Sequence, residues 1–129
     1  MGALARTAYQ AAHLLGVTAL MRRLQGSRVP VLMYHGVSSK RISGVLNWEK
    51  KHVAAADFER HLKFLKSRYQ VIPLSRYGAF LRGGGALPRG CAVVTFDDGY
   101  ENNHSFAFPL LKKYGIPATV FVTADFVEN

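Results

Sequence analysis

The chain alternates short apolar runs with longer amphipathic stretches, and this alternation predicts its fold class. The strongest run, residues 91–96 (CAVVTF), is continuous and rich in β-branched side chains, which is typical of a strand buried on both faces. Shorter apolar runs at residues 29–37, 71–72 and 117–123 predict further strands.

Helical patterns lie between these runs. Residues 57–69 place apolar side chains at i, i+4 and i+7 and basic ones on the opposite face. Residues 75–82 predict a second helix, with Ser75 as its N-cap. Residues 106–114 predict a third helix, which Gly115 ends. Strands that alternate with helices indicate an α/β protein with a parallel sheet.

The first 28 residues differ from the rest and predict a basic amphipathic helix. Ala, Leu and Met are frequent up to Gly26, and no proline interrupts. Arg22 and Arg23 follow the apolar stretch, where a signal peptide would have a small-residue cleavage site, so that interpretation is disfavoured. Two others stay open: a helix packed on its own domain or a partner, and contact with an anionic membrane surface.

Composition and charge narrow the possible classes. Of 129 residues, 49% are hydrophobic and 19% charged, which is ordinary for a globular domain. The net charge is +9, and residues 1–48 carry six basic residues and no acid. No nucleic-acid motif accompanies this charge, so we expect no nucleic-acid partner. The single cysteine, Cys91, excludes an internal disulfide and a cysteine-based zinc cluster.

The segment TFDDGY, residues 95–100, carries the candidate chemistry. Asp97 and Asp98 follow the strongest strand, and active sites of parallel β/α proteins lie at the carboxyl ends of their strands. Adjacent residues that leave a strand point in different directions, so one carboxylate can bind a metal while the other takes a proton from water. Gly99 allows a sharp turn. The alternative interpretation is a solvated Asp-Gly turn without chemistry.

Two segments, VPVLMYHGV at residues 29–37 and AVVTFDDGYENNHSFAFPLLKKYGIPATVFV at residues 92–122, resemble the polysaccharide deacetylase family (carbohydrate esterase family 4, the NodB homology domain). The resemblance implies the N-terminal part of a distorted (β/α)7 barrel of the glycoside hydrolase/deacetylase type, preceded by the N-terminal helix. It divides the chain into residues 1–28 and a truncated deacetylase domain, residues 29–129. The implied activity is metal-dependent hydrolysis of the N-acetyl amide of an amino-sugar glycan, with an N-acetylated polysaccharide or glycolipid as substrate.

The resemblance also assigns roles to the two carboxylates. Asp97 matches the family's general base, and Asp98 matches a ligand of a divalent metal, usually zinc. The family's two metal-binding histidines come from a later HxxxH-like motif, and no two histidines of this chain are three or four residues apart. We therefore expect an incomplete, inactive fragment of a hydrolase. The alternative is an inactive carbohydrate-binding or interaction module of the same fold.

Other residues are candidates for the surroundings of this site. His35, at the end of the first strand, is expected either to neighbour the substrate or metal or to make a structural hydrogen bond. Tyr100 and Trp48 are candidates for stacking on sugar rings, with simple packing as the alternative. The chain has three further histidines in this region, all expected at the surface or near a helix cap: His52, His61 and His104. The localisation stays open, with the membrane or cell envelope favoured.

Overall fold

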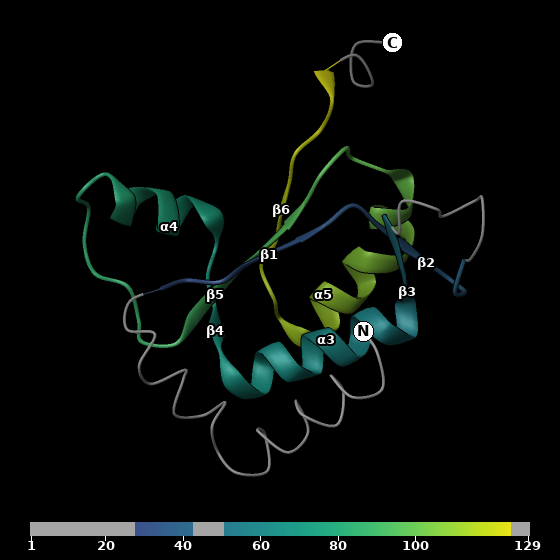
Figure 1. Ribbon diagram of the computed structural model, residues 1–129, viewed down its shortest axis with the longest axis horizontal. Coiled ribbons are helices and arrows are strands. Elements are labelled where there is room, and N and C mark those ends of the chain that lie inside the picture. The colour runs from purple at the N-terminus through teal and green to yellow at the C-terminus, as the bar shows by residue number, and fades with distance from the viewer. Residues whose placement is uncertain (1–27, 43–50, 125–129) are drawn as a thin grey trace, which may run out of the picture.

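The structure is a computed structural model that describes residues 28–42 and 51–124 (Figure 1). The helix predicted for residues 1–28, and with it the predicted membrane contact, falls almost wholly outside the described residues, as does Trp48. Among the described residues, no helix has the length and apolar character needed to span a bilayer.

Strand β5 (Cys91–Phe96) is the centre of a parallel sheet. Strand β1 (Val31–Tyr34) pairs with β5 along one edge. On the opposite edge, β4 (Gln70–Val71) pairs with the first half of β5 and β6 (Thr119–Val120) with the second half. The parallel pairing confirms the α/β class, because helices connect these strands as the sequence pattern predicts.

Both faces of β5 are buried, and all six of its residues lie in the core. One face packs with helices α3 (Ala55–Arg68) and α5 (Phe108–Tyr114), which lie side by side in Figure 1. The other face, which includes Cys91, packs with Ile72 and with residues of α4 (Leu74–Leu81). The helices therefore form a layer on each side of the central strand, as expected for a continuous apolar run.

The structure divides one predicted strand and adds a strand that was not predicted. The strand predicted at residues 29–37 is divided into β1 and β2 (Gly36–Ser38), with His35 between them. Strand β2 pairs in parallel with β3 (His52–Ala54), which the sequence pattern did not predict. Three residues are too few to show the alternation of apolar and polar side chains that predicts a strand. Strand β3 is therefore recognised only from its pairing with β2.

The helix limits also differ in detail. Ser75 is not an N-cap: the cap position of α4 is Pro73, with no side-chain hydrogen bond. The helix predicted at residues 106–114 starts earlier, with a π-helical turn, η2 (Asn103–Ala107), that continues into α5. Gly115 ends α5 in the left-handed conformation, with φ 63°, so its predicted role is confirmed.

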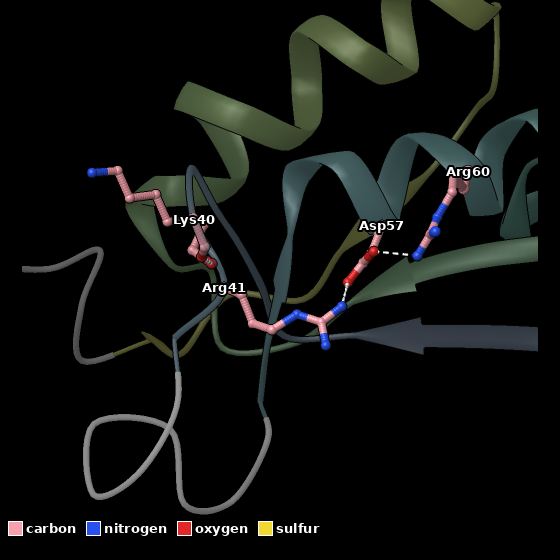
Figure 2. Close-up of polar contacts among 5 residues, drawn as sticks. Lys40, Arg41, Asp57 and Arg60 are labelled. Atoms are coloured by element: carbon pink, nitrogen blue, oxygen red, sulfur yellow. Dashed lines mark hydrogen bonds and ion pairs between the residues drawn. The ribbon is translucent and has the colours of Figure 1, made fainter.

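Two ion pairs lie at the surface around the first turn of α3. Asp57 in its first turn binds Arg41 at 2.7 Å and also Arg60 (Figure 2). Arg41 follows β2, so this contact ties the segment after β2 to the start of α3. Both arginines are exposed, and ion pairs of this kind contribute little to stability, about 0–1 kcal/mol.

A second polar group joins α3 to α5. Glu59 accepts hydrogen bonds from Lys113 Nζ at 2.8 Å and from the Tyr114 hydroxyl at 2.6 Å. These two contacts, with Lys63 at 3.9 Å, lower the pKa of the Glu59 carboxyl to about 2. Folding therefore favours the ionised form of the Glu59 carboxyl over its protonated form.

Candidate functional site

The carboxyl ends of β1, β5 and β6 meet at one edge of the sheet. The Asp97 amide donates to the Tyr34 carbonyl at 2.8 Å, so the pairing of β1 with β5 continues past the end of β5. On the other side, the Phe121 amide donates to the Phe96 carbonyl, also at 2.8 Å. His35 and Asp97 therefore leave neighbouring strands at the same edge, which is where parallel β/α proteins carry their sites.

Residues 97–103, here called the acidic loop, follow β5 and carry both candidate carboxylates. Asp97 and Asp98 are half-buried. Asp98 has φ 67° and is the only non-glycine residue with positive φ in the part of the chain that the structure describes. Gly99 follows with φ 69°, so the chain makes the sharp turn expected there. Left-handed residues other than glycine cost about 1–2 kcal/mol, and such positions cluster at functional sites.

Gly99 is needed for a second reason. A Cβ atom at this position would lie 3.0 Å from Val122 Cγ1, so the acidic loop lies against the segment after β6. Any side chain here would strain the backbone and push this segment away. The turn that carries Asp98 is therefore fixed from one side by close packing.

Two asparagines hold the far end of the acidic loop. Asn103 Nδ2 donates to the His35 carbonyl at 2.8 Å, and Asn102 Nδ2 lies 3.1 Å from His52 Nδ1. The Oδ1 atoms of both asparagines are buried and have no hydrogen-bond partner among the described residues. The sequence analysis missed both residues, since an Asn-Asn pair after an acidic turn carries no motif of its own.

The structure places His35 at the edge of the sheet, as predicted, where it is half-buried. The contact that the structure shows is made by its main-chain carbonyl, which accepts the hydrogen bond from Asn103 Nδ2. A role of the His35 imidazole toward substrate or metal stays a prediction. Before it, Tyr34 is buried at the end of β1, its hydroxyl lies 3.1 Å from His61 Nδ1, and burial raises the pKa of Tyr34 to about 12.

His52 departs from the sequence prediction of a surface position, because it is half-buried. Its ring meets the ring of Tyr100 edge-on, with centroids 5.1 Å apart. A Cβ atom on Gly36 would lie 2.2 Å from His52 Nδ1, so the imidazole occupies the space that this glycine leaves open. Tyr100 keeps 36% of its surface exposed, and its predicted contact with sugar stays a prediction. His61 and His104 are exposed, as predicted.

We tested whether the residues of this edge fit the expected metal. A catalytic zinc ion takes three protein ligands. In residues 28–42 and 51–124, no group of three or more His, Cys, Asp or Glu side chains is arranged to hold a metal ion. The described residues therefore do not form a complete three-ligand metal centre around Asp98.

The two carboxylates thus lie at the carboxyl edge of a parallel α/β sheet, the edge at which proteins of the β/α class carry their sites. The family model described as polysaccharide deacetylase matches residues 84–129, which include the whole acidic loop. YxkH of Bacillus subtilis (strain 168), which carries the name of a polysaccharide deacetylase, is 35% identical over 106 residues, 81% of this chain and 35% of that protein. Over the part that aligns, the chain thus matches the polysaccharide deacetylase family.

Other relatives agree. The poly-β-1,6-N-acetyl-D-glucosamine N-deacetylase of Staphylococcus aureus (strain N315) is 33% identical over 75 residues, 58% of this chain and 26% of the relative. This chain spans between about a quarter and about a third of the length of these relatives.

Solved structures extend the likeness to the fold. IcaB from Ammonifex degensii is 31% identical with a TM-score of 0.63, over 75% of this chain and 39% of that one. A de-N-acetylase from Aggregatibacter actinomycetemcomitans is 26% identical with a TM-score of 0.59, over 71% of this chain and 36% of that one. These matches confirm the predicted fold, part of a (β/α) barrel of the deacetylase type.

Proposed function

We propose that this chain is part of a deacetylase that hydrolyses the N-acetyl amide of an amino-sugar polysaccharide. The observation that carries the proposal is the acidic loop: two adjacent carboxylates at the carboxyl edge of a parallel sheet, one of them in a left-handed conformation. The deacetylase names of the relatives support the reaction, and the poly-N-acetylglucosamine in one of those names supports the substrate class.

Asp97 is the proposed general base. Amide hydrolysis needs a water that loses its proton as it attacks the carbonyl carbon, and a carboxylate within hydrogen-bond reach accepts that proton. The Asp97 amide is fixed to the Tyr34 carbonyl, so the backbone that carries this carboxylate is held by the sheet. A base that is already held in place loses less conformational entropy when the transition state forms, which lowers the barrier.

Asp98 is the proposed ligand of a divalent metal, with zinc as the first candidate. When bound, such an ion polarises a carbonyl and lowers the pKa of water. The described residues supply Asp98 but no complete ligand set, so the metal dependence rests on the family resemblance. Titration of the protein with zinc in a calorimeter tests it. Binding that is lost in Asp98→Asn supports the assignment, and equal binding by both proteins contradicts it.

Release of acetate from β-1,6-linked N-acetylglucosamine oligomers tests the reaction itself, with the whole deacetylase of which we propose this chain is part as the parent protein. We expect Asp97→Asn to lower kcat by about 10²–10⁴-fold, the usual contribution of a general base, without a change in the unfolding midpoint. Ser67→Ala is the matched control, since Ser67 is exposed on α3 and its hydroxyl donates to the Phe64 carbonyl. Equal acetate release by the parent protein and Asp97→Asn would refute the role of Asp97.

A second candidate function is a binding module of the same fold. It is favoured by the lack of a three-ligand metal group among the described residues. This candidate predicts that the protein binds the same oligomers in a calorimeter but releases no acetate at any zinc concentration.

A further inference from the structure

The acidic loop has little regular structure of its own to hold it. Its two central residues, Asp98 and Gly99, are both left-handed, and inside the loop one main-chain hydrogen bond, from the Asn103 amide to the Tyr100 carbonyl at 2.9 Å, closes the turn. A short turn of this kind keeps one geometry only if its surroundings determine it. The contacts at the two ends of the loop are therefore decisive.

At the first end, the sheet holds the loop, because the Asp97 amide donates to the Tyr34 carbonyl at 2.8 Å. At the second end, side chains take over this task. Asn103 is 6% exposed and donates at 2.8 Å to the carbonyl of His35. His35 lies between β1 and β2 and is paired in neither ladder. The asparagine amide thus occupies the position that a strand neighbour would have.

Asn102 makes a comparable contact with the two-stranded sheet formed by β2 and β3. Its amide nitrogen lies 3.1 Å from Nδ1 of His52, in β3. The His52 ring is itself confined by Gly36, on which a Cβ would come within 2.2 Å, and by the ring of Tyr100. Two adjacent asparagines therefore connect the loop to the residue that follows β1 and to the first residue of β3.

Each asparagine uses its donor and leaves a buried acceptor without a partner among the described residues. Such an acceptor costs about 1–3 kcal/mol, so stability alone does not explain two of them side by side. We propose that Asn102 and Asn103 are positioning residues, which hold the acidic loop against the ends of β1 and β3 so that the Asp97 carboxylate keeps one orientation. The consequence for catalysis rests on the proposed function, whereas the consequence for the loop does not.

Amide hydrogen exchange tests the positioning directly. The reporters are two loop amides with hydrogen bonds, Asp97 and Asn103, and two sheet amides, Ile72 (to the Ala92 carbonyl) and Val93 (to the Pro30 carbonyl). In Asn103→Ala we expect the loop amides to exchange about tenfold faster, the equivalent of one lost hydrogen bond, while the sheet amides keep the parent rate. Ser67→Ala, in α3 and away from the loop, is the control and should leave all four unchanged.

Parent-like exchange at the loop amides of Asn103→Ala would overturn the proposal. Equal acceleration of loop and sheet amides would also overturn it, since the asparagine would then support the fold as a whole. If Asn103→Ala does not fold, Asn102→Ala decides in the same way, because it removes the contact to His52 alone. There we expect faster exchange at the Asn103 amide and parent rates in the sheet.

Kinetics separate positioning from a purely structural role. With β-1,6-linked N-acetylglucosamine oligomers and rates expressed per folded molecule, we expect Asn103→Ala to lower kcat and to leave KM unchanged. Unchanged kcat beside a loosened loop would overturn the link to catalysis. If the parent protein releases no acetate, the proposed deacetylase function fails, and hydrogen exchange still decides whether the asparagines hold the loop.

Discussion

Strand β5 and the acidic loop are consecutive in the chain but are stabilised in opposite ways. All six residues of β5 are buried, and neighbours pair with it on both edges. Apart from the buried Asn103, the loop is half-buried or exposed; it has two left-handed residues and is held by side-chain hydrogen bonds. The strand is fixed by apolar burial, which is non-directional, and the loop by a few contacts that each set a direction.

This difference explains how one short segment can supply both rigidity and chemistry. Apolar packing tolerates no polar reactive group, so the strand places the carboxylates just beyond its last buried residue, Phe96. The polar contacts then set the orientation that packing cannot set. Changes in β5 should therefore affect folding, and changes in the loop should affect activity.

The largest expected effect is in the strand. Phe96 is completely buried and its ring lies against those of Tyr34 and Phe58, at 5.5 and 5.8 Å between centroids. Phe96→Ala should lower the free energy of unfolding by about 3–5 kcal/mol, measured by urea denaturation. Phe64→Ala, at a phenylalanine that is 50% exposed, is the matched control. Similar losses for the two variants would show that β5 does not dominate the core.

The next effect concerns Gly36 at the start of β2, which leaves the space that His52 occupies beside the acidic loop. Gly36→Ala would bring a methyl group to 2.2 Å from His52 Nδ1, so we expect a loss of about 1–3 kcal/mol from overpacking. Gly78→Ala, inside α4 with a nearest contact at 3.4 Å, should instead stabilise the protein by up to about 1 kcal/mol. Both changes in the free energy of unfolding are to be measured by thermal unfolding. Tolerance of Gly36→Ala would mean that His52 is not confined there.

A smaller effect should have opposite signs for stability and activity. Asp98→Gly removes a side chain from a left-handed position, φ 67°, and should raise the free energy of unfolding by up to about 1 kcal/mol. The same change removes the proposed metal ligand, so acetate release should fall. Denaturation and acetate assays on one preparation measure both. A destabilised Asp98→Gly would show that the Asp98 side chain supports the loop.

The smallest effect lies outside β5 and the acidic loop, where α3 meets α5. The pKa of Glu59 is lowered to about 2, chiefly by the hydrogen bond from Lys113. The ionised form therefore stabilises the folded state above the unfolded-state pKa of about 4.3, and this contribution is lost as the pH falls toward 2. Unfolding midpoints of the parent and Glu59→Gln should differ more at pH 7 than at pH 2.5. A difference independent of pH would exclude an ionic origin.

The sequence predicted those elements whose stability is local or continuous. Residues 91–96 form β5 with the predicted limits, since an unbroken β-branched run has one stable environment. The helix predicted at residues 57–69 matches α3, Ala55–Arg68, within two residues at each end, because its periodicity extends over several turns.

The rest depended on tertiary contacts. Strand β3 exists through its pairing with β2, and the position of His52 depends on the space left by Gly36. The edge that carries Asp97 and His35 was predictable, since both follow strands of one parallel sheet. The contacts of Asn102 and Asn103 were not, because hydrogen bonds between residues 50 and 68 positions apart leave no periodic trace.

The π-helical turn after the acidic loop has a further consequence. In η2 the Phe108 amide donates to the Asn103 carbonyl, five residues back, so the turn contains one residue more than an α-helical turn would. If the same residues were wound as an α-helix, every side chain before this turn would rotate by about 100° relative to α5. Asn103 would then turn away from the sheet while Leu111 stayed in the core. The register of the helix, as much as the identity of the asparagine, thus determines whether the loop is held.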